Sequence, residues 1–274
     1  MPSPATSVHA HLRLNAPAPA AAGLLIAVAG RHGVELLSET LRVTGPDGPL
    51  PVRELRAGDG ARLHEVTVPA GTTTIDYDAS AVTSTGPDTL LGALERWEFT
   101  RPSRFCPSDR LISFAAAEFG RLDAGAHRER LPDLVATWVS QNTAYVSGSS
   151  TPTDGALETL LGREGVCRDF AHLVVALLRA LDVPARLCAV YAPGLSPMDF
   201  HAVVEAAPDG RWQVVDATRL APRNSLLRIA SGRDAADTAF LTTAGRVDLE
   251  ELSVRAVVEG DLPADDHAHR VVLR

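Results

Sequence analysis

The chain has 274 residues, of which 45% are hydrophobic and 22% charged, with a formal net charge of −8. This composition is typical of a globular protein large enough for one or two domains. The negative charge argues against a nucleic-acid partner, because there is no basic excess to displace counterions from phosphates. All 26 basic residues are arginine, since the sequence contains no lysine.

The cysteines and the N-terminal region bear on the cellular compartment. Cys106, Cys167 and Cys188 form no paired spacing, so we expect no disulfide framework. The apolar run 20–30 is too short to span a bilayer, and no basic region precedes it as in a signal peptide. We therefore expect a cytoplasmic protein that binds neither membranes nor nucleic acid.

Residues 1–98 are predicted to form a small β-sandwich. Short β-rich runs alternate with turns rich in Gly, Pro and Asp, at the regular spacing typical of that fold. No catalytic grouping of residue types is present in this part. The predicted strands are 9–14, 24–29, 35–43, 63–68 and 72–77.

Residues 99–274 contain predicted helices followed by strands, an order that indicates an α+β fold with helices packed on an antiparallel sheet. Helical spacing predicts helices over 108–119, from Pro132 to Asn142 and from Thr153 to Gly162. A fourth helix, 167–181, is apolar nearly all round and should be buried. The strands that follow are 185–191, 201–206, 212–218 and 252–258.

Cys167 lies in the first turn of that buried helix, directly after the flexible Gly165-Val166 segment. A helix N-terminus carries partial positive charge and unpaired N–H groups, which stabilise a thiolate. The same N–H groups can bind the oxyanion that forms when sulfur attacks a carbonyl. An isolated cysteine at such a position is more often a buried core residue, so a second feature must decide.

The second feature is a predicted hairpin around Pro208-Asp209-Gly210. If its loop is 207–210, His201 faces Asp216 directly, and opposed side chains lie within hydrogen-bond reach. A bulge at Gly210 would change this register. A carboxylate on one imidazole nitrogen leaves the other free to accept a proton. With Cys167, this pair would form a Cys-His-Asp site for acyl transfer.

Three segments resemble the bacterial transglutaminase-like superfamily, whose core is papain-like. Gly165 to Leu173 resembles the family's cysteine motif, Phe200 to Glu205 its histidine strand, and Trp212 to Thr218 its aspartate strand. The chain departs from the family at Val203, where tryptophan is common, and at Ala217, where proline is common. Neither position carries the proton chemistry.

The resemblance implies an N-terminal β domain, 1–98, followed by a catalytic core, 99–274. It also implies Cys167 as nucleophile, His201 as base and Asp216 as the residue that orients the base, without metal or cofactor. The backbone N–H of Cys167 and the side chain of Tyr145 would bind the oxyanion; Trp138 and Gln141 are weaker candidates for the second donor. The expected substrate is a peptide or protein amide, which is hydrolysed or transferred to an amine.

Two other functions remain open. The chain could be a binding or scaffold protein that keeps the fold without catalysis, or Cys167, His201 and Asp216 could bind a metal. Other polar residues are interpreted as structural. Asp169 should cap the helix, and His172, about 140° around the helix from Cys167, should be a core residue. Cys188 is expected in the core, Cys106 in a loop, 231–237 at a helix start and 265–269 in a polar tail.

Overall fold

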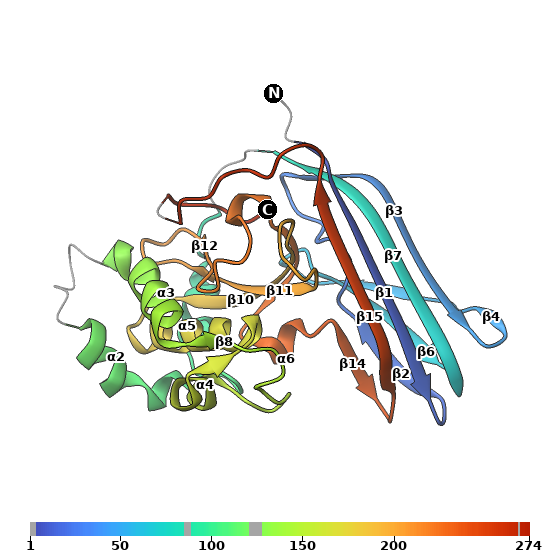
Figure 1. The fold of residues 1–274 in the computed structure, drawn as a ribbon, viewed down its shortest axis with the longest axis horizontal. Coiled ribbons are helices and arrows are strands. Elements are labelled where there is room, and N and C mark those ends of the chain that lie inside the picture. Colours follow the sequence, from blue (N-terminus) through green and yellow to red (C-terminus); the bar gives the residue numbers. More distant parts are fainter. Residues whose placement is uncertain (1–3, 85–88, 121–127, 268) are drawn as a thin grey trace.

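The computed structural model describes residues 4–84, 89–120, 128–267 and 269–274. Figure 1 shows long strands at one end of the molecule and helices around a smaller sheet at the other. Among the helices of the described residues, none is both long and apolar enough to cross a bilayer.

Two antiparallel sheets make up the strand-rich end. Along β1, alternate side chains are buried, so one face of its sheet packs inward and the other faces solvent. The buried side chains of both sheets belong to one hydrophobic cluster that includes Leu12, Leu24, Val66 and Ile75. The first sheet has the order β15 (Asp248–Val258), β1 (Thr6–Ala16), β7 (Gly71–Thr83), β3 (Val34–Gly45) and β4 (Gly48–Pro49). The second has the order β14 (Leu241–Ala244), β2 (Ala20–Leu24), β6 (Arg62–Val68) and β5 (Arg53–Arg56).

The last strands of the chain return to these two sheets. β15 pairs with β1 from Thr6↔Val258 to Asn15↔Asp248, and β14 pairs with β2. The same hydrophobic cluster also contains Tyr191 and Leu227 from the smaller sheet at the other end. The division into 1–98 and 99–274 stays a prediction, but residues from both sides of it build the two sheets.

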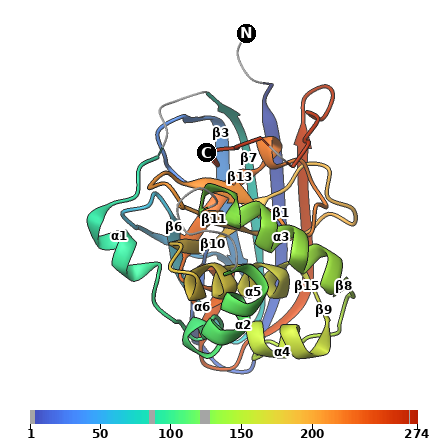
Figure 2. The same ribbon diagram turned by 90° about the vertical axis from the view of Figure 1, so that its left-hand side faces the viewer.

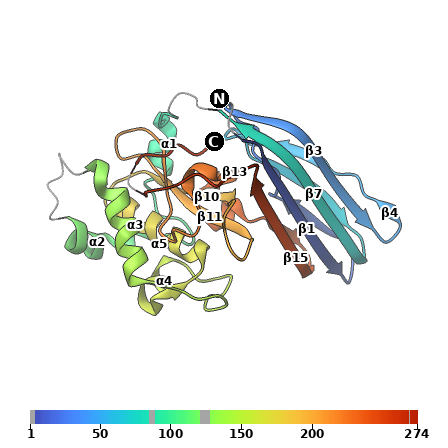
Figure 3. The same ribbon diagram turned by 45° about the horizontal axis from the view of Figure 1, so that its top comes forward.

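The smaller sheet is antiparallel and has the order β12 (Gln213–Val215), β11 (Phe200–Ala206), β10 (Ala185–Tyr191) and β13 (Leu227–Gly232). Helix α5 (Cys167–Ala180) packs against β11 and β10, and eleven of its residues are buried. Three helices pack against α5 (Figures 1 and 3): α2 (Ile112–Phe119), α3 (Leu131–Asn142) and α4 (Ala156–Gly162). The predicted α+β order, with helices on an antiparallel sheet, is confirmed here.

The remaining elements are short. α1 (Ala93–Glu98) lies at the side of the molecule, away from the other helices (Figure 2), and α6 (Ala235–Thr238) follows β13. Single 3₁₀ turns occupy Ser108–Arg110, Arg128–Arg130 and Arg223–Ser225. β8 (Ala144–Tyr145) and β9 (Glu164–Gly165) form a two-stranded parallel pair.

Two predicted strands differ from the structure. The predicted strand 24–29 is wrong beyond Leu24: the buried residues that follow form isolated backbone hydrogen bonds, from Leu25 N–H to Phe240 O and from Ala29 N–H to Arg228 O. These two hydrogen bonds join the strand-rich end to the C-terminal part of the chain. The apolar character of residues 25–29 therefore reflects burial and not pairing in a β-sheet. The predicted strand 212–218 shortens to β12, because the chain turns at Asp216.

Candidate active site

The first turn of α5 is fixed by Asp169. Its Oδ2 accepts the backbone N–H of Val166 at 2.9 Å and the hydroxyl of Ser150 at 2.6 Å, while Oδ1 accepts Arg168 Nη2 at 2.8 Å. Asp169 is fully buried. The interpretation of Asp169 as a capping residue is therefore confirmed, and the cap holds the turn that begins at Cys167.

Gly165 allows this cap to form. A Cβ at Gly165 would lie 2.6 Å from Cβ of Asp169, a distance that side chains do not adopt. Gly165 also belongs to β9, which pairs with β8 and brings Tyr145 alongside. The sulfur-bearing residue that follows, Cys167, is half-buried and free of any disulfide.

His201 and Asp216 meet, although the predicted register is wrong. Glu205 pairs with Val214 and Ala206 with Gln213, a shift of two residues from the predicted pairing. The cause is a wider connection than the one assumed, with Gly210 in the left-handed region at φ 81°. A shift of two residues keeps side chains on the same face of a sheet. His201 Nε2 therefore still lies 2.9 Å from Asp216 Oδ2.

The histidine is almost completely buried and its charge is stabilised. Burial lowers the pKa of His201, but the charge and hydrogen bond of Asp216 and the proximity of Cys167 outweigh it and raise this pKa to about 10. Burial raises the pKa of Asp216, and its interactions with His201 and Thr218 outweigh burial and lower it. Nδ1 of His201, the nitrogen away from Asp216, is buried without a hydrogen-bond partner of good geometry among the described residues. The arrangement favours an imidazolium beside the Cys167 sulfur.

Tyr145 lies against the same cysteine. Its pKa is raised to about 12, first by burial and then by the negative charge of a Cys167 thiolate, and it interacts with both the backbone and the side chain of Cys167. The phenol is therefore neutral at pH 7 and able to donate a hydrogen bond. Its ring packs on Phe170, with 5.9 Å between ring centroids.

The two weaker oxyanion candidates, Trp138 and Gln141, belong to α3. Trp138 packs edge-on against Phe114 at 5.5 Å and Phe119 at 6.1 Å, and Arg163 stacks over its ring. Gln141 is exposed. The contacts of Trp138 are those of a core aromatic side chain.

Two residues at this site were not predicted from the sequence. Thr218 donates its backbone N–H and its hydroxyl to Asp216 Oδ1 at 2.8 and 2.7 Å, and its Oγ1 lies 3.4 Å from His201 Nε2. Asp199 accepts the N–H of Phe200 at 2.7 Å, and burial raises its pKa. Thr two residues after Asp, a common turn pattern, could have been recognised from sequence; Asp199 shows no comparable pattern.

Three further residues that were interpreted as structural, His172, Cys106 and Cys188, are core residues. His172 is fully buried, stacks on Phe105 at 5.1 Å and accepts the N–H of Ala235 on Nε2 at 3.1 Å, as expected for a core histidine. Cys106 and Cys188 are fully buried, and burial raises the pKa of each to about 12. Cys106 lies in a loop, as expected, and its side chain is part of the hydrophobic core. Asp265 binds Arg223 at 2.9 Å.

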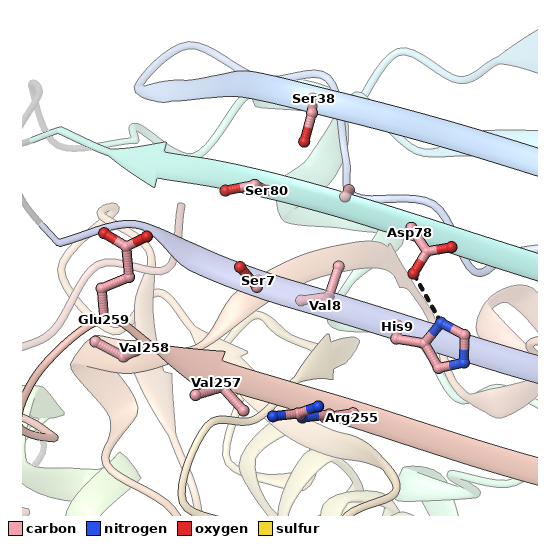
Figure 4. Close-up of a pocket in the computed structure, with 11 residues that line it drawn as sticks. Ser7, Val8, His9, Ser38, Asp78, Ser80, Arg255, Val257, Val258 and Glu259 are labelled. Atoms are coloured by element: carbon pink, nitrogen blue, oxygen red, sulfur yellow. Dashed lines mark hydrogen bonds and ion pairs between the residues drawn. The ribbon is translucent and has the colours of Figure 1, made fainter.

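A separate pocket of about 450 Å³ lies on the solvent-facing side of the five-stranded sheet (Figure 4). In it, His9 Nδ1 bonds Asp78 Oδ1 at 2.8 Å. These are opposed residues of β1 and β7, and both are partly exposed. Because no cysteine lines this pocket, it is not the candidate active site, which we place at Cys167. Within the described residues, no group of three or more His, Cys, Asp or Glu side chains is arranged to hold a metal ion.

Comparisons with known proteins bear on the family of the chain. The model of the transglutaminase-like superfamily matches residues 124–217. An uncharacterized protein of Mycobacterium tuberculosis is 34% identical over 159 residues, which is 50% of each chain. One of Mycobacterium leprae is 26% identical over 157 residues, or 53% of each. This chain thus aligns with about half the length of these curated relatives.

A solved structure from Cytophaga hutchinsonii, described as a “putative cysteine protease”, matches with a TM-score of 0.88 at 31% identity. The match covers 98% of this chain and 96% of that one. Since the likeness extends over nearly all of both chains, and the family model includes Cys167, His201 and most of the aspartate segment, the chain belongs to the transglutaminase-like superfamily.

Proposed function

We propose that the chain is a cysteine-dependent acyl-transfer enzyme that acts on amide bonds. Membership of the superfamily and the likeness to a protein described as a cysteine protease support an enzyme that uses cysteine. The observation that carries the finer proposal is the His201–Asp216 hydrogen bond of 2.9 Å, with the imidazole beside the Cys167 sulfur. A carboxylate, an imidazole and a thiol in this order are the components of an acyl-transfer triad.

In the first step, the Cys167 thiolate attacks the carbonyl carbon of the amide. The backbone N–H of Cys167 and the Tyr145 hydroxyl donate hydrogen bonds to the oxyanion that develops on the carbonyl oxygen. His201, as the imidazolium, donates its proton to the leaving nitrogen as the C–N bond breaks. The products are a thioester on Cys167, a free amine and a neutral imidazole.

In the second step, His201 accepts a proton from the acyl acceptor. Asp216 holds the ring and stabilises the charge that returns to it. With water as acceptor the chain is a peptidase or amidase, and with a primary amine it is a transglutaminase. Collapse of the second tetrahedral intermediate expels the thiolate and restores the ion pair.

The proposal is tested with a mixture of glutamine-containing peptides, with and without an added primary amine. Mass spectrometry of the peptides and an ammonia assay should detect cleaved, deamidated or amine-coupled products. Cys167→Ala should form none of them. Ammonia release that is unaffected by the amine would exclude the transferase and leave hydrolysis.

The contrary outcome is equally specific. If no product forms, and Cys167 alkylates with iodoacetamide no faster than a free thiol, the chain is a binding or scaffold protein that keeps the fold. Cys167→Ser serves as the structural control, because it retains the size of the side chain while removing the nucleophile.

A further inference from the structure

A second pocket, of about 390 Å³, has a lining that does not include Cys167. It is formed by the loop between β2 and β3, the loop between β5 and β6, helix α1 and the first residues of β10. Figure 2 shows α1, one of these elements, at the edge of the molecule. Three of the lining residues, Gly30, Gly58 and Gly60, carry no side chain.

A buried ion cluster lies next to this pocket. Glu205 accepts Arg186 Nε on Oε2 at 2.8 Å and Arg228 Nη2 on Oε1 at 2.5 Å. The three side chains are at most 3% exposed. Arg186 also stacks over Trp212, 4.1 Å from the ring centroid, and contributes to the pocket lining. Two guanidinium groups thus share one buried carboxylate, and both of its oxygens are occupied.

Arg31 adds a third guanidinium to the pocket. Within the part of the chain that the structure describes, the Arg31 side chain has no hydrogen bond or ion pair, and its Nη1 is buried without a partner. Burial, followed by repulsion from Arg228, lowers the pKa of Arg31 to about 10, so it is still charged at pH 7. A buried donor without a partner is costly, and it is most costly in a charged group.

The backbone holds Arg31 in this position. A Cβ at Gly60 would lie 2.6 Å from Cγ of Arg31, so only glycine allows the arginine stem to pack there. Gly30 N–H bonds Gly60 O at 2.9 Å and ties the two loops together. The unpaired guanidinium is therefore part of a built loop pair.

The acidic residues of the pocket are already engaged. Asp59 accepts the Ala61 N–H on Oδ1 at 3.1 Å and the Ser231 hydroxyl on Oδ2 at 2.7 Å. Glu95 accepts the Gly92 N–H on Oε2 at 2.7 Å and Arg186 Nη1 on Oε1 at 3.0 Å. Both carboxylates are used within the fold, which leaves the donors of Arg31 to an external acceptor.

We propose that this pocket binds a small oxyanion, a phosphate or a carboxylate group, on the Arg31 guanidinium. The planar fork of an arginine matches both groups bidentately, and the nearby Arg186 adds attraction. The pocket is large enough for an anionic metabolite or the anionic group of a larger ligand. Glu205 lies four residues beyond His201 on β11, about 13 Å along the strand, so this site is separate from the candidate active site.

Calorimetry with sodium phosphate and, separately, sodium acetate tests the proposal at constant ionic strength and pH 7. One anion should bind saturably, one per chain, and should raise the Tm by an amount that grows with the logarithm of the anion concentration above its Kd. Arg31→Gln should weaken that binding at least tenfold and abolish the rise in Tm. The anion that binds, phosphate or acetate, identifies the chemical group that the pocket accepts.

Two further variants keep the result interpretable. Arg31→Lys retains the charge but not the fork, and we expect intermediate affinity. Arg246→Gln removes the same charge from a side chain that is 77% exposed, and should bind like the parent chain. Because burial and the neighbouring Arg228 oppose the charge on Arg31, Arg31→Gln should not lower the Tm that is measured without anion. Absence of saturable binding to the parent, or equal binding by Arg31→Gln, would overturn the proposal.

Discussion

The buried imidazole of His201 contributes both to the stability of the fold and to the proposed chemistry. Its folded-state pKa, about 10, lies above the value of about 6.5 for an unfolded histidine. The stabilisation is therefore complete below about pH 6.5 and is lost as the pH rises through about 10. Asp216 has the opposite dependence: its pKa is lowered, so its contribution is present above about pH 4 and is lost as the pH falls.

The charge on His201 predicts the rate of thiol alkylation. The pKa of His201 is raised to about 10, so its imidazolium is present beside the Cys167 sulfur at pH 6. In His201→Ala, which lacks this charge, iodoacetamide should modify Cys167 about a hundredfold more slowly at pH 6 than in the parent chain. Mass spectrometry of the alkylated chain measures both rates.

The labelling reports on Cys167 because the other two cysteines, Cys106 and Cys188, are fully buried. His9→Ala, on the solvent-facing side of the five-stranded sheet, is the control and should behave as the parent. An unchanged alkylation rate in His201→Ala at pH 6 would contradict the ion pair.

At the level of elements, the N-terminus of α5 is the part on which the site depends. The cap between Val166 and Asp169 and the pairing of β9 with β8 hold Cys167 and Tyr145 together. Both interactions pass through Gly165, where the backbone approaches Asp169 too closely for a side chain. A substitution there should affect the site through the helix start rather than through any reacting group.

Gly165→Ala is expected to lower the free energy of unfolding by about 1–3 kcal/mol, because the new Cβ displaces Asp169 from the cap. Alkylation of Cys167 at pH 6 should slow as well. Gly162→Ala is the matched control: it lies at the end of α4, and a Cβ there meets nothing within 4 Å. Urea unfolding measures the first effect, and equal stabilities for the two variants would disprove the role of the close approach.

At the scale of the whole molecule, the two ends share secondary structure and a core. β15 and β14 pair with strands from the first 98 residues, and Tyr191 of the smaller sheet packs in the cluster of the larger ones. Its hydroxyl also donates to Ile26 O at 2.7 Å. We therefore expect the two ends to unfold together.

Val254→Asp should destabilise the whole chain by about 3–5 kcal/mol, because it places an unpaired charge at a core position of β15 that is 6% exposed. Ser253→Asp, one residue earlier on the exposed face, should change stability by no more than about 0.5 kcal/mol. In urea, circular dichroism and the labelling of Cys188 in the smaller sheet should share one midpoint. Two separate transitions, with only one shifted by Val254→Asp, would instead support independent units at 1–98 and 99–274.

Local sequence patterns were sufficient where a residue's neighbours along the chain determine its conformation. The helices α2 to α5 lie where apolar spacing, Pro132 and the glycines after helix ends predict them. β10 was predicted to the residue, because Pro184 precedes it and its apolar run is short. Conversely, residues 25–29 are as apolar as a strand but do not form one. A short apolar run indicates burial, and burial is shared by β-strands and by buried connecting segments.

The sequence by itself determined which residue types are available for catalysis: a thiol at a helix start and a histidine and an aspartate on one sheet face. The two-residue period of a strand decides which face of the sheet a side chain lies on, and a register shift of two residues leaves that face unchanged. Tertiary structure alone decided the rest. The register depends on the conformation of one glycine, β15 pairs with a strand more than two hundred residues away, and Arg31 faces a pocket made of four separate segments. These are contacts between distant parts of the chain, and no local pattern encodes them.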